Sequence, residues 1–433
     1  MYRLTSFRSV AVVAAGALVG LAACEQNRDV LMAPPAPTPA NAIFASYVAL
    51  GNSITAGFQS NGINDSTQKQ SYAVLLAKSM NTPFRYPSLA MPGCSAPIAN
   101  TQTGALVTTG VPAGTAALPC YGRTFATDTG EILNNVAVPG ARVLDPTSTA
   151  TVASNTLTQL FLKGGTQVSQ ALRAHPTFAS IWIGNNDVLT AGLSGIVKPT
   201  PGLGAGIISD SATFATNYNL MLSQLIAGAP GLKGILIGVA KVQNLPSLSS
   251  GALIASTSAT GTAIRNGINQ AAGTTVTVMP NCVGSASLIN VPLLIGAIRK
   301  YVANPATAGA HPPVISCDVN TSAPYPYPVG DIYVLDAGEQ ATLNGAIDGY
   351  NSYISAKANT IGFAYYDPNI LFAAKRADGT IPAFPNLAST NATFGTLISL
   401  DGIHPTAAAH LLIANGLITA INAKYATTLP AAQ

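Results

Sequence analysis

The stretch SYVALGNSI, residues 46–54, joins a short apolar run to a serine and then to the start of a helical pattern. Residues 46–50 predict a buried strand, because apolar runs of this length that end in turn residues are typical of strands. Gly51 and Asn52 end the run, and Ile54 begins the helical pattern. Ser53 is therefore expected just beyond the carboxyl end of a strand, at the amino end of a helix.

The same arrangement recurs along the chain. Further apolar segments of strand length occur at residues 134–138, 178–183, 234–239 and 362–366. Helical patterns at residues 214–227 and 337–358 precede the last two segments. Apolar strands that alternate with helices indicate a parallel sheet covered on both faces. The expected fold class is α/β, with three α/β/α layers and a flavodoxin-like, doubly wound parallel sheet of about five strands.

Short polar motifs follow the ends of three predicted strands. They are GNSI at residues 51–54, VPGA at 138–141 and GNND at 184–187, and a fourth motif, DGIHP, stands at 401–405. Ligands of open parallel sheets bind beyond the carboxyl ends of the strands. We therefore expect all four motifs to meet at that edge of the sheet.

The motifs contain the residue types that acyl transfer through a serine requires. A serine hydroxyl needs a general base, usually a histidine whose ring is held by a carboxylate. Ser53, His404 and Asp401 can fill these roles, and Asp401 precedes His404 by three residues in a turn. The negatively charged oxygen of the intermediate needs hydrogen-bond donors. The backbone N–H groups of Ser53 and Gly140 and the side-chain amide of Asn186 can form this oxyanion hole.

At these residues the chain resembles the SGNH, or GDSL-type, hydrolase family, which is named after the Ser, Gly, Asn and His of four blocks. All four occur here in the family's order, and the resemblance extends over residues 45–424. It implies an esterase or lipase-type hydrolase that cleaves carboxylic esters through an acyl-enzyme, with no metal and no organic cofactor. One position departs from the pattern: Asn52 stands where the family name implies Asp, so it brings no charge beside Ser53.

The N-terminus predicts export. Arg3 and Arg8 precede an apolar run at residues 10–23 that ends in Leu-Ala-Ala before Cys24. These features are typical of a secretory signal peptide. A cysteine at this point resembles a bacterial lipobox, which implies cleavage before Cys24 and lipidation of its thiol. The other interpretation is an uncleaved membrane anchor, but a run of about 14 residues is shorter than the roughly 20 that span a bilayer.

Three segments are therefore expected along the chain. They are a lipoprotein signal peptide at residues 1–23, the lipidated cysteine with a Pro/Ala-rich spacer at 24–42, and a hydrolase domain at 43–433. A spacer of this composition stays extended. Glu25 stands where a retention Asp would be, which favours the outer membrane or cell surface over the inner membrane.

The four cysteines after Cys24 predict two disulfides, because an even number suits an oxidising compartment. Neighbours in the sequence suggest the pairs Cys94–Cys120 and Cys282–Cys317, although three connectivities are possible. Each closed loop would contribute about 3–4 kcal/mol in the chain-entropy model. A metal site is the rival interpretation, but the sequence has no close-spaced pairs of Cys or His ligands.

Two segments do not follow the alternation of strands and helices. Residues 94–130 and about 245–330 are rich in Gly, Ser, Thr and Pro, and each contains one predicted disulfide. We interpret both as insertions on the core domain. Two roles stay open for them: they cover the rim of the active site and select the substrate, or they decorate the surface.

Composition restricts the partners. Charged residues make up 8% of the chain, and the net charge of +4 becomes +2 when Arg3 and Arg8 leave with the signal. This leaves no basic patch for nucleic acid. The expected partners are an acyl ester (a lipid, a short-chain ester or an acylated glycan) and a membrane, reached through the lipid on Cys24. Two other functions stay open: acyl transfer or thioester cleavage by the same residues, and binding of glycan or lipid without turnover.

Overall fold

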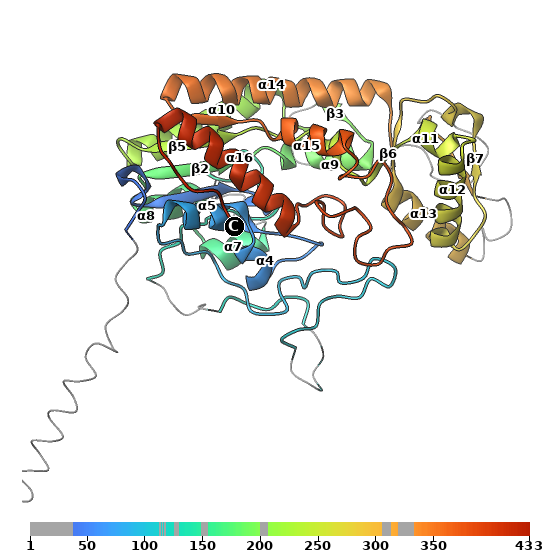
Figure 1. The fold of residues 1–433 in the computed structure, drawn as a ribbon, viewed down its shortest axis with the longest axis horizontal. Coiled ribbons are helices and arrows are strands. Elements are labelled where there is room, and N and C mark those ends of the chain that lie inside the picture. The colour runs from blue at the N-terminus through green and yellow to red at the C-terminus, as the bar shows by residue number, and fades with distance from the viewer. Residues whose placement is uncertain are drawn as a thin grey trace, which may run out of the picture. The chain divides into compact units, whose positions relative to one another are not determined.

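A parallel sheet of four strands forms the centre of the computed structural model (Figure 1). The structure describes residues 38–111, 114, 116, 118–124, 130–148, 155–199, 207–304, 313–318 and 333–433. The strands lie in the order β1-β2-β5-β11, and each adjacent pair is parallel. Their bounds are Tyr47–Gly51 for β1, Phe178–Trp182 for β2, Lys233–Ile237 for β5 and Ala364–Tyr366 for β11. The sheet confirms the predicted α/β fold class.

The remaining predicted strand, residues 134–138, runs beside β1 as an irregular edge. Asn135 pairs with Ala49 in a single parallel bridge. Farther along, the N–H of Val138 donates to the carbonyl oxygen of Gly51 at 3.1 Å. When this segment is counted as the second strand along the sequence, the strands lie side by side in the sheet in the order 2-1-3-4-5. This is the flavodoxin-like order.

Side chains alternate between the two faces of the sheet and meet a different layer of helices on each. Val48 and Leu50 belong to the core on one face, whereas Tyr47 and Ala49 belong to the core on the other. The first core is completed by α8 Gln167–Arg173, α9 Asn186–Ser194, α10 Ser211–Gly228 and α14 Ala337–Ile361. The second is completed by α5 Tyr72–Met80, α15 Pro368–Ala377 and α16 Ala407–Tyr425. The fold therefore has the three expected layers.

Local sequence signals explain where the longest helix begins and ends. Asp336 caps α14 by accepting a hydrogen bond from the N–H of Glu339 at 2.8 Å, and the Glu339 side chain accepts one from the N–H of Asp336 in return. Such a capping box satisfies backbone donors that have no partner within the helix. Gly362 ends the helix with a φ of 74°, a conformation that glycine adopts without steric cost.

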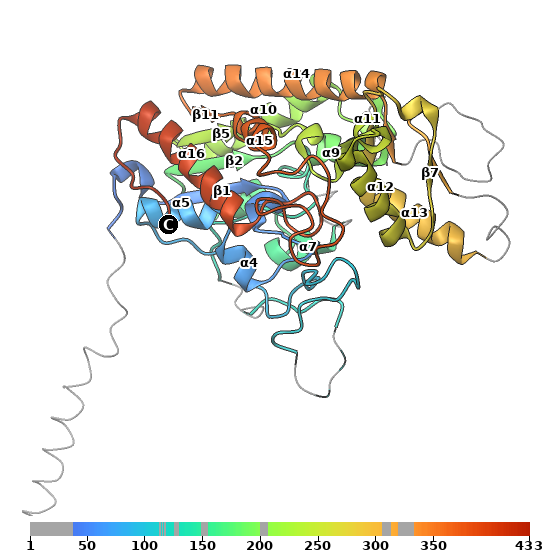
Figure 2. The same ribbon diagram turned by 45° about the vertical axis from the view of Figure 1, so that its right-hand side comes forward.

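Both predicted disulfides are present, Cys94–Cys120 and Cys282–Cys317. The first closes a region of loops. The second lies in a region with three helices and a small antiparallel sheet, β10-β8-β6. This region has its own apolar cluster, which includes Ile264, Ile289 and Ile298. Its helices are α11 Gly251–Ala255, α12 Ala259–Ala272 and α13 Val291–Ala303, and its strands are β6 Leu248–Ser250, β8 Leu288–Asn290 and β10 Val334–Leu335 (Figures 1 and 2).

The predicted signal peptide, Cys24 and most of the predicted spacer lie outside the described residues. Within the described ranges, no helix combines the length and the apolar character needed to cross a membrane.

Candidate active site

Ser53 lies where the first strand passes into the short helix α3, Ser53–Ala56. Asn52 caps this helix, since its side-chain Oδ1 accepts a hydrogen bond from the N–H of Ile54 at 3.1 Å. Asparagine and aspartate cap helices equally well, so the amide of Asn52 can fill this role without a charge. A Cβ on Gly51 would lie 2.6 Å from the carbonyl oxygen of Trp182, so only glycine lets the chain turn this close to β2.

A chain of hydrogen bonds links Ser53 to two residues near the other end of the sequence. The Oγ of Ser53 lies 2.9 Å from Nε2 of His404, and Nδ1 of His404 lies 2.8 Å from Oδ2 of Asp401. The structure thus brings together the serine, histidine and carboxylate that the motifs predict. Only 12% of the His404 side chain and 7% of the Asp401 side chain are exposed, so water competes little with these contacts.

The surroundings of Asp401 fix its charge. Burial by itself would raise the pKa of this carboxyl, but the neighbouring His404 and hydrogen bonds from the N–H groups of His404 and Asn61 lower the pKa to about 2. An ionised carboxylate only accepts hydrogen bonds, so Nδ1 of His404 must carry the proton that it donates. Nε2 is then left as the acceptor that faces the hydroxyl of Ser53.

The predicted oxyanion donors are the N–H groups of Ser53 and Gly140 and the side chain of Asn186. Within the described part of the chain, neither the N–H of Ser53 nor that of Gly140 has a hydrogen-bond partner. The side-chain Nδ2 of Asn186 donates one hydrogen bond to the carbonyl oxygen of Ala141 at 2.9 Å and has a second hydrogen to offer. Gly140 has a φ of 83°, which most other residues do not adopt without strain. All three groups therefore retain an N–H that can donate a further hydrogen bond.

Asp187 follows Asn186 and holds the neighbouring loops. Its two carboxylate oxygens accept hydrogen bonds from the N–H of Val143 at 2.9 Å and from the hydroxyl of Ser209 at 2.7 Å. Burial raises the pKa of Asp187 to about 6, although both hydrogen bonds act to lower it. The loop that carries Gly140 and Ala141 is thus fastened to the start of α9, which carries Asn186.

Three supporting residues carry no signal in the sequence. Gln167 bonds to both the N–H and the carbonyl oxygen of Gly51, and so fixes the turn before Ser53. The N–H of Asn61 and the hydroxyl of Ser399 donate to the carboxylate of Asp401. The contacts of Gln167 and Asn61 join distant parts of the chain, whereas Ser399 lies only two residues before Asp401, and none of these residues belongs to one of the four motifs.

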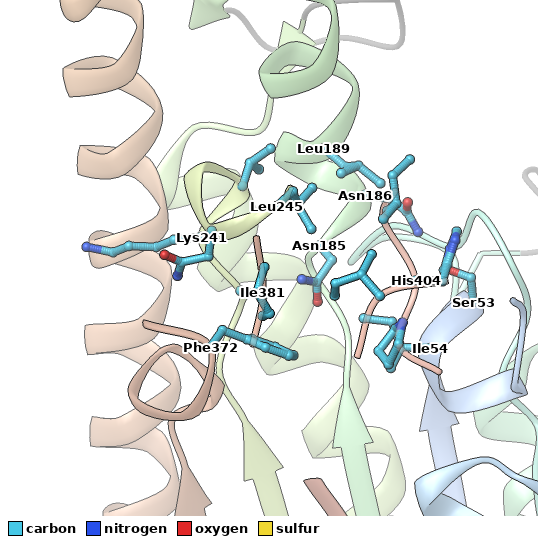
Figure 3. A pocket seen from close by; sticks show the side chains of 16 residues that line it. Ser53, Ile54, Asn185, Asn186, Leu189, Lys241, Leu245, Phe372, Ile381 and His404 are labelled. Atoms are coloured by element: carbon cyan, nitrogen blue, oxygen red, sulfur yellow. The ribbon is translucent and has the colours of Figure 1, made fainter. Parts of the chain in front are cut away.

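An apolar pocket opens beside Ser53. Figure 3 shows Ser53 and His404 together at one end and Lys241 at the other, with Leu245, Ile381 and Phe372 between them. The amine of Lys241 pairs with Asp348 at 2.8 Å. Among the described residues, no group of three or more His, Cys, Asp and Glu side chains is placed to hold a metal ion.

One hydrogen-bonded chain joins a serine, a histidine and a carboxylate just beyond the carboxyl end of β1. This arrangement in an α/β fold has the geometry of a serine hydrolase. The chain belongs to the GDSL-like lipase/acylhydrolase family, whose model matches residues 47–417.

Solved structures that match this chain include a protein described as a GDSL-like lipase from Parabacteroides merdae ATCC 43184. It is 12% identical, with a TM-score of 0.35 over 87% of this chain and 96% of that chain. An extracellular lipase from Streptomyces rimosus is 16% identical, with a TM-score of 0.30 over 87% of this chain and 98% of that chain. No curated protein sequence matches this chain.

Proposed function

We propose that this hydrolase cleaves carboxylic esters, with Ser53 as nucleophile, His404 as general base and Asp401 as the group that orients His404. The continuous hydrogen-bonded chain from Ser53 through His404 to Asp401 carries the proposal. The apolar pocket that begins at Ser53 supports it further, since such a pocket accepts the hydrocarbon part of an ester.

The reaction follows from these contacts. Oγ of Ser53 attacks the ester carbonyl carbon while Nε2 of His404 takes its proton, and the carbonyl oxygen becomes an anion. The N–H groups of Ser53 and Gly140 and the amide of Asn186 stabilise this oxygen, and each such donor is worth about 3–4 kcal/mol in comparable sites. His404 then returns the proton to the departing alcohol oxygen as the carbon–oxygen bond breaks. Water, activated by the same histidine, releases the acid from Ser53.

Labelling of the purified full chain with a fluorophosphonate probe, followed by peptide mapping, tests the assignment. We expect a single adduct on Ser53 that disappears in His404→Ala, because the hydroxyl is reactive only beside a base. Ser223→Ala, which alters an exposed serine of α10, is the matched control and should label normally. Absence of an adduct on folded protein with both disulfides intact would favour the non-catalytic binding module instead.

The same residues would serve an acyltransferase or a thioesterase. An added alcohol or sugar that captures the acyl group in preference to water would identify a transferase. Faster turnover of thioesters than of matched oxygen esters would identify a thioesterase.

We further propose that the protein is exported and anchored to the bacterial cell envelope, at the outer membrane or cell surface, by a lipid on Cys24. The basic start, the apolar run and the Leu-Ala-Ala-Cys sequence support this. In cells grown with an alkyne-labelled fatty acid, the wild type should carry the label and remain with the membranes. Cys24→Ser should carry none, and equal labelling of both proteins would contradict the proposal.

A further inference from the structure

The pocket beside Ser53 contains more polar side chains than the proposed reaction uses. Its polar members are Ser53, Asn185, Asn186, Lys241, Asn244 and His404, and its other walls are apolar. Ser53, Asn186 and His404 already have roles at the ester bond. Because Ser53 and His404 are themselves part of the wall, one substituent of the ester that Ser53 attacks enters this pocket. The polar side chains without a role at the bond therefore face that substituent.

Two of these three side chains belong to the boundary of the pocket. In Figure 3 the side chain of Lys241 extends away from Ser53, and its amine pairs with Asp348 of α14 at 2.8 Å. Asn244 also lines a second, polar hollow on the far side of Lys241. This leaves Asn185 as the polar side chain inside the pocket that has no other role.

The amide of Asn185 has no partner within the described protein. Its Oδ1 is buried and, among the residues that the structure describes, receives no hydrogen bond. In Figure 3 this amide lies between Ile381 and Phe372 on one side and His404 on the other. Rotation of an amide by half a turn exchanges its oxygen and its nitrogen. A group that both donates and accepts a hydrogen bond therefore matches either orientation.

Asn185 does not perform the structural role that its position suggests. It is the N-cap of α9, where an asparagine side chain usually accepts a hydrogen bond from a backbone N–H of the first turn. Here the side chain makes no such bond, and the backbone has the helical φ of −61° and ψ of −39°. The backbone carbonyl oxygen of Asn185 accepts hydrogen bonds from the N–H groups of Val188 and Leu189 instead. A substitution of this side chain therefore leaves these bonds in place.

An amide without a partner in an apolar pocket selects among bound molecules. Burial of a polar group is unfavourable unless a hydrogen bond accompanies it, so an apolar substituent that covers this amide binds poorly. A substituent that supplies the partner avoids this cost. The pocket has a cavity volume of about 50 Å³, which accommodates only a few groups the size of water. A hydroxyl is the smallest group that both donates and accepts, and it fits this space.

We propose that Asn185 determines specificity by binding a hydroxyl of the substrate, so that the preferred esters carry a hydroxyl on a short substituent. The hydroxyl would stand about three or four bonds from the carbonyl carbon, because Asn185 directly precedes the oxyanion donor Asn186 and adjacent Cα atoms are about 3.8 Å apart. This assignment rests on the proposed ester hydrolysis and adds the substrate class to it. The acyl part and the alcohol part of an ester can each carry such a hydroxyl, and the test separates the two.

The test uses two pairs of esters in which a methyl group replaces the hydroxyl. Methyl β-hydroxybutyrate, with its enantiomers measured separately, is compared with methyl isovalerate, and ethylene glycol monoacetate is compared with propyl acetate. Titration of the released acid gives kcat/KM for each ester with the full chain. In the wild type we expect the hydroxylated member of one pair to be favoured at least about 10-fold, since a site that binds a hydroxyl discriminates against the analogue without it. Preference in the first pair places the acyl part in the pocket, and preference in the second places the alcohol part there.

Asn185→Leu removes the amide and keeps a side chain of similar size. We expect the favoured ratio to fall at least about 10-fold in this variant, through slower hydrolysis of the hydroxylated ester alone. Methyl isovalerate and propyl acetate should be hydrolysed at least as well as by the wild type. Asn266 is an exposed residue of α12 outside the pocket, so Asn266→Leu is the matched control and should keep the wild-type ratios.

These ratios do not depend on the amount of folded enzyme, because both esters of a pair are measured on the same sample. A wild type without preference in either pair, or a preference that survives in Asn185→Leu, would overturn the assignment while leaving ester hydrolysis intact. An equal loss for both members of a pair would also overturn it, because Asn185 would then act on the reaction in general. A wild type that hydrolyses none of the four esters would contradict the proposed function as well.

Discussion

Ser53→Ala is expected to lower kcat for ester hydrolysis by about 10⁴- to 10⁶-fold, because the variant has no nucleophile to form the acyl-enzyme. Any residual rate would come from the donors of the oxyanion hole and from substrate binding. The fold should persist, since among the residues that the structure describes the lost hydroxyl bonds only to His404, and the N-cap of α3 is Asn52.

Initial rates with a p-nitrophenyl ester of butyrate would measure this loss. Ser223→Ala serves again as the control and should keep wild-type kcat, while circular dichroism verifies that both variants are folded. If Ser53→Ala retained more than about a tenth of wild-type kcat, another residue would have to be the nucleophile.

Asp401→Asn is expected to lower kcat by about 10³- to 10⁴-fold, although a side chain of the same size still contacts His404. The amide that replaces the carboxylate can donate to Nδ1 of His404, which moves the ring proton to Nε2. The base then has no lone pair for the hydroxyl of Ser53. Asp336→Asn is a suitable control, because asparagine caps a helix as well as aspartate does.

The same variant should change the pH dependence of stability. The pKa of Asp401 in the folded protein, about 2, lies below its ordinary value of 3.8. Its charge therefore stabilises the fold by about 2–3 kcal/mol above the ordinary pKa, and this contribution is lost as the pH falls through 2. Denaturant unfolding should show Asp401→Asn to be less stable than the wild type at pH 7, with a smaller difference at pH 2. Equal differences at both pH values would contradict the assigned pKa.

The sequence predicts the parts of this fold that depend on local pattern. The apolar runs at residues 46–50 and 178–183 coincide with central strands because they are buried on both faces and need no other signal. Residues 134–138 begin with two asparagines and form only an irregular edge with one bridge to β1. Their position at the edge, which limits them to one neighbour, is not visible in the sequence.

Some residues of the candidate site could likewise be predicted from local sequence motifs, and others could not. Ser53, Asp401 and His404 could be predicted because each stands in a short motif whose spacing suits its chemistry. The residues that hold them, such as Gln167 and Asn61, act through contacts that only the folded chain creates. The pocket beside Ser53 was equally unpredictable, since its wall combines residues from distant parts of the chain such as 53–54, 240–245 and 398–405.

Ser53 and His404 lie far apart in the sequence, and this affects the chain during its synthesis. The hydrogen bond between them joins residues 351 positions apart in the chain. A nascent chain that ends before residue 401 already contains the serine but has neither the base nor the carboxylate beside it. Under the proposed mechanism, an incomplete chain therefore cannot hydrolyse esters in the compartment where it is synthesised. Hydrolytic activity appears only when the turn that carries Asp401 and His404 has packed beside the end of the first strand.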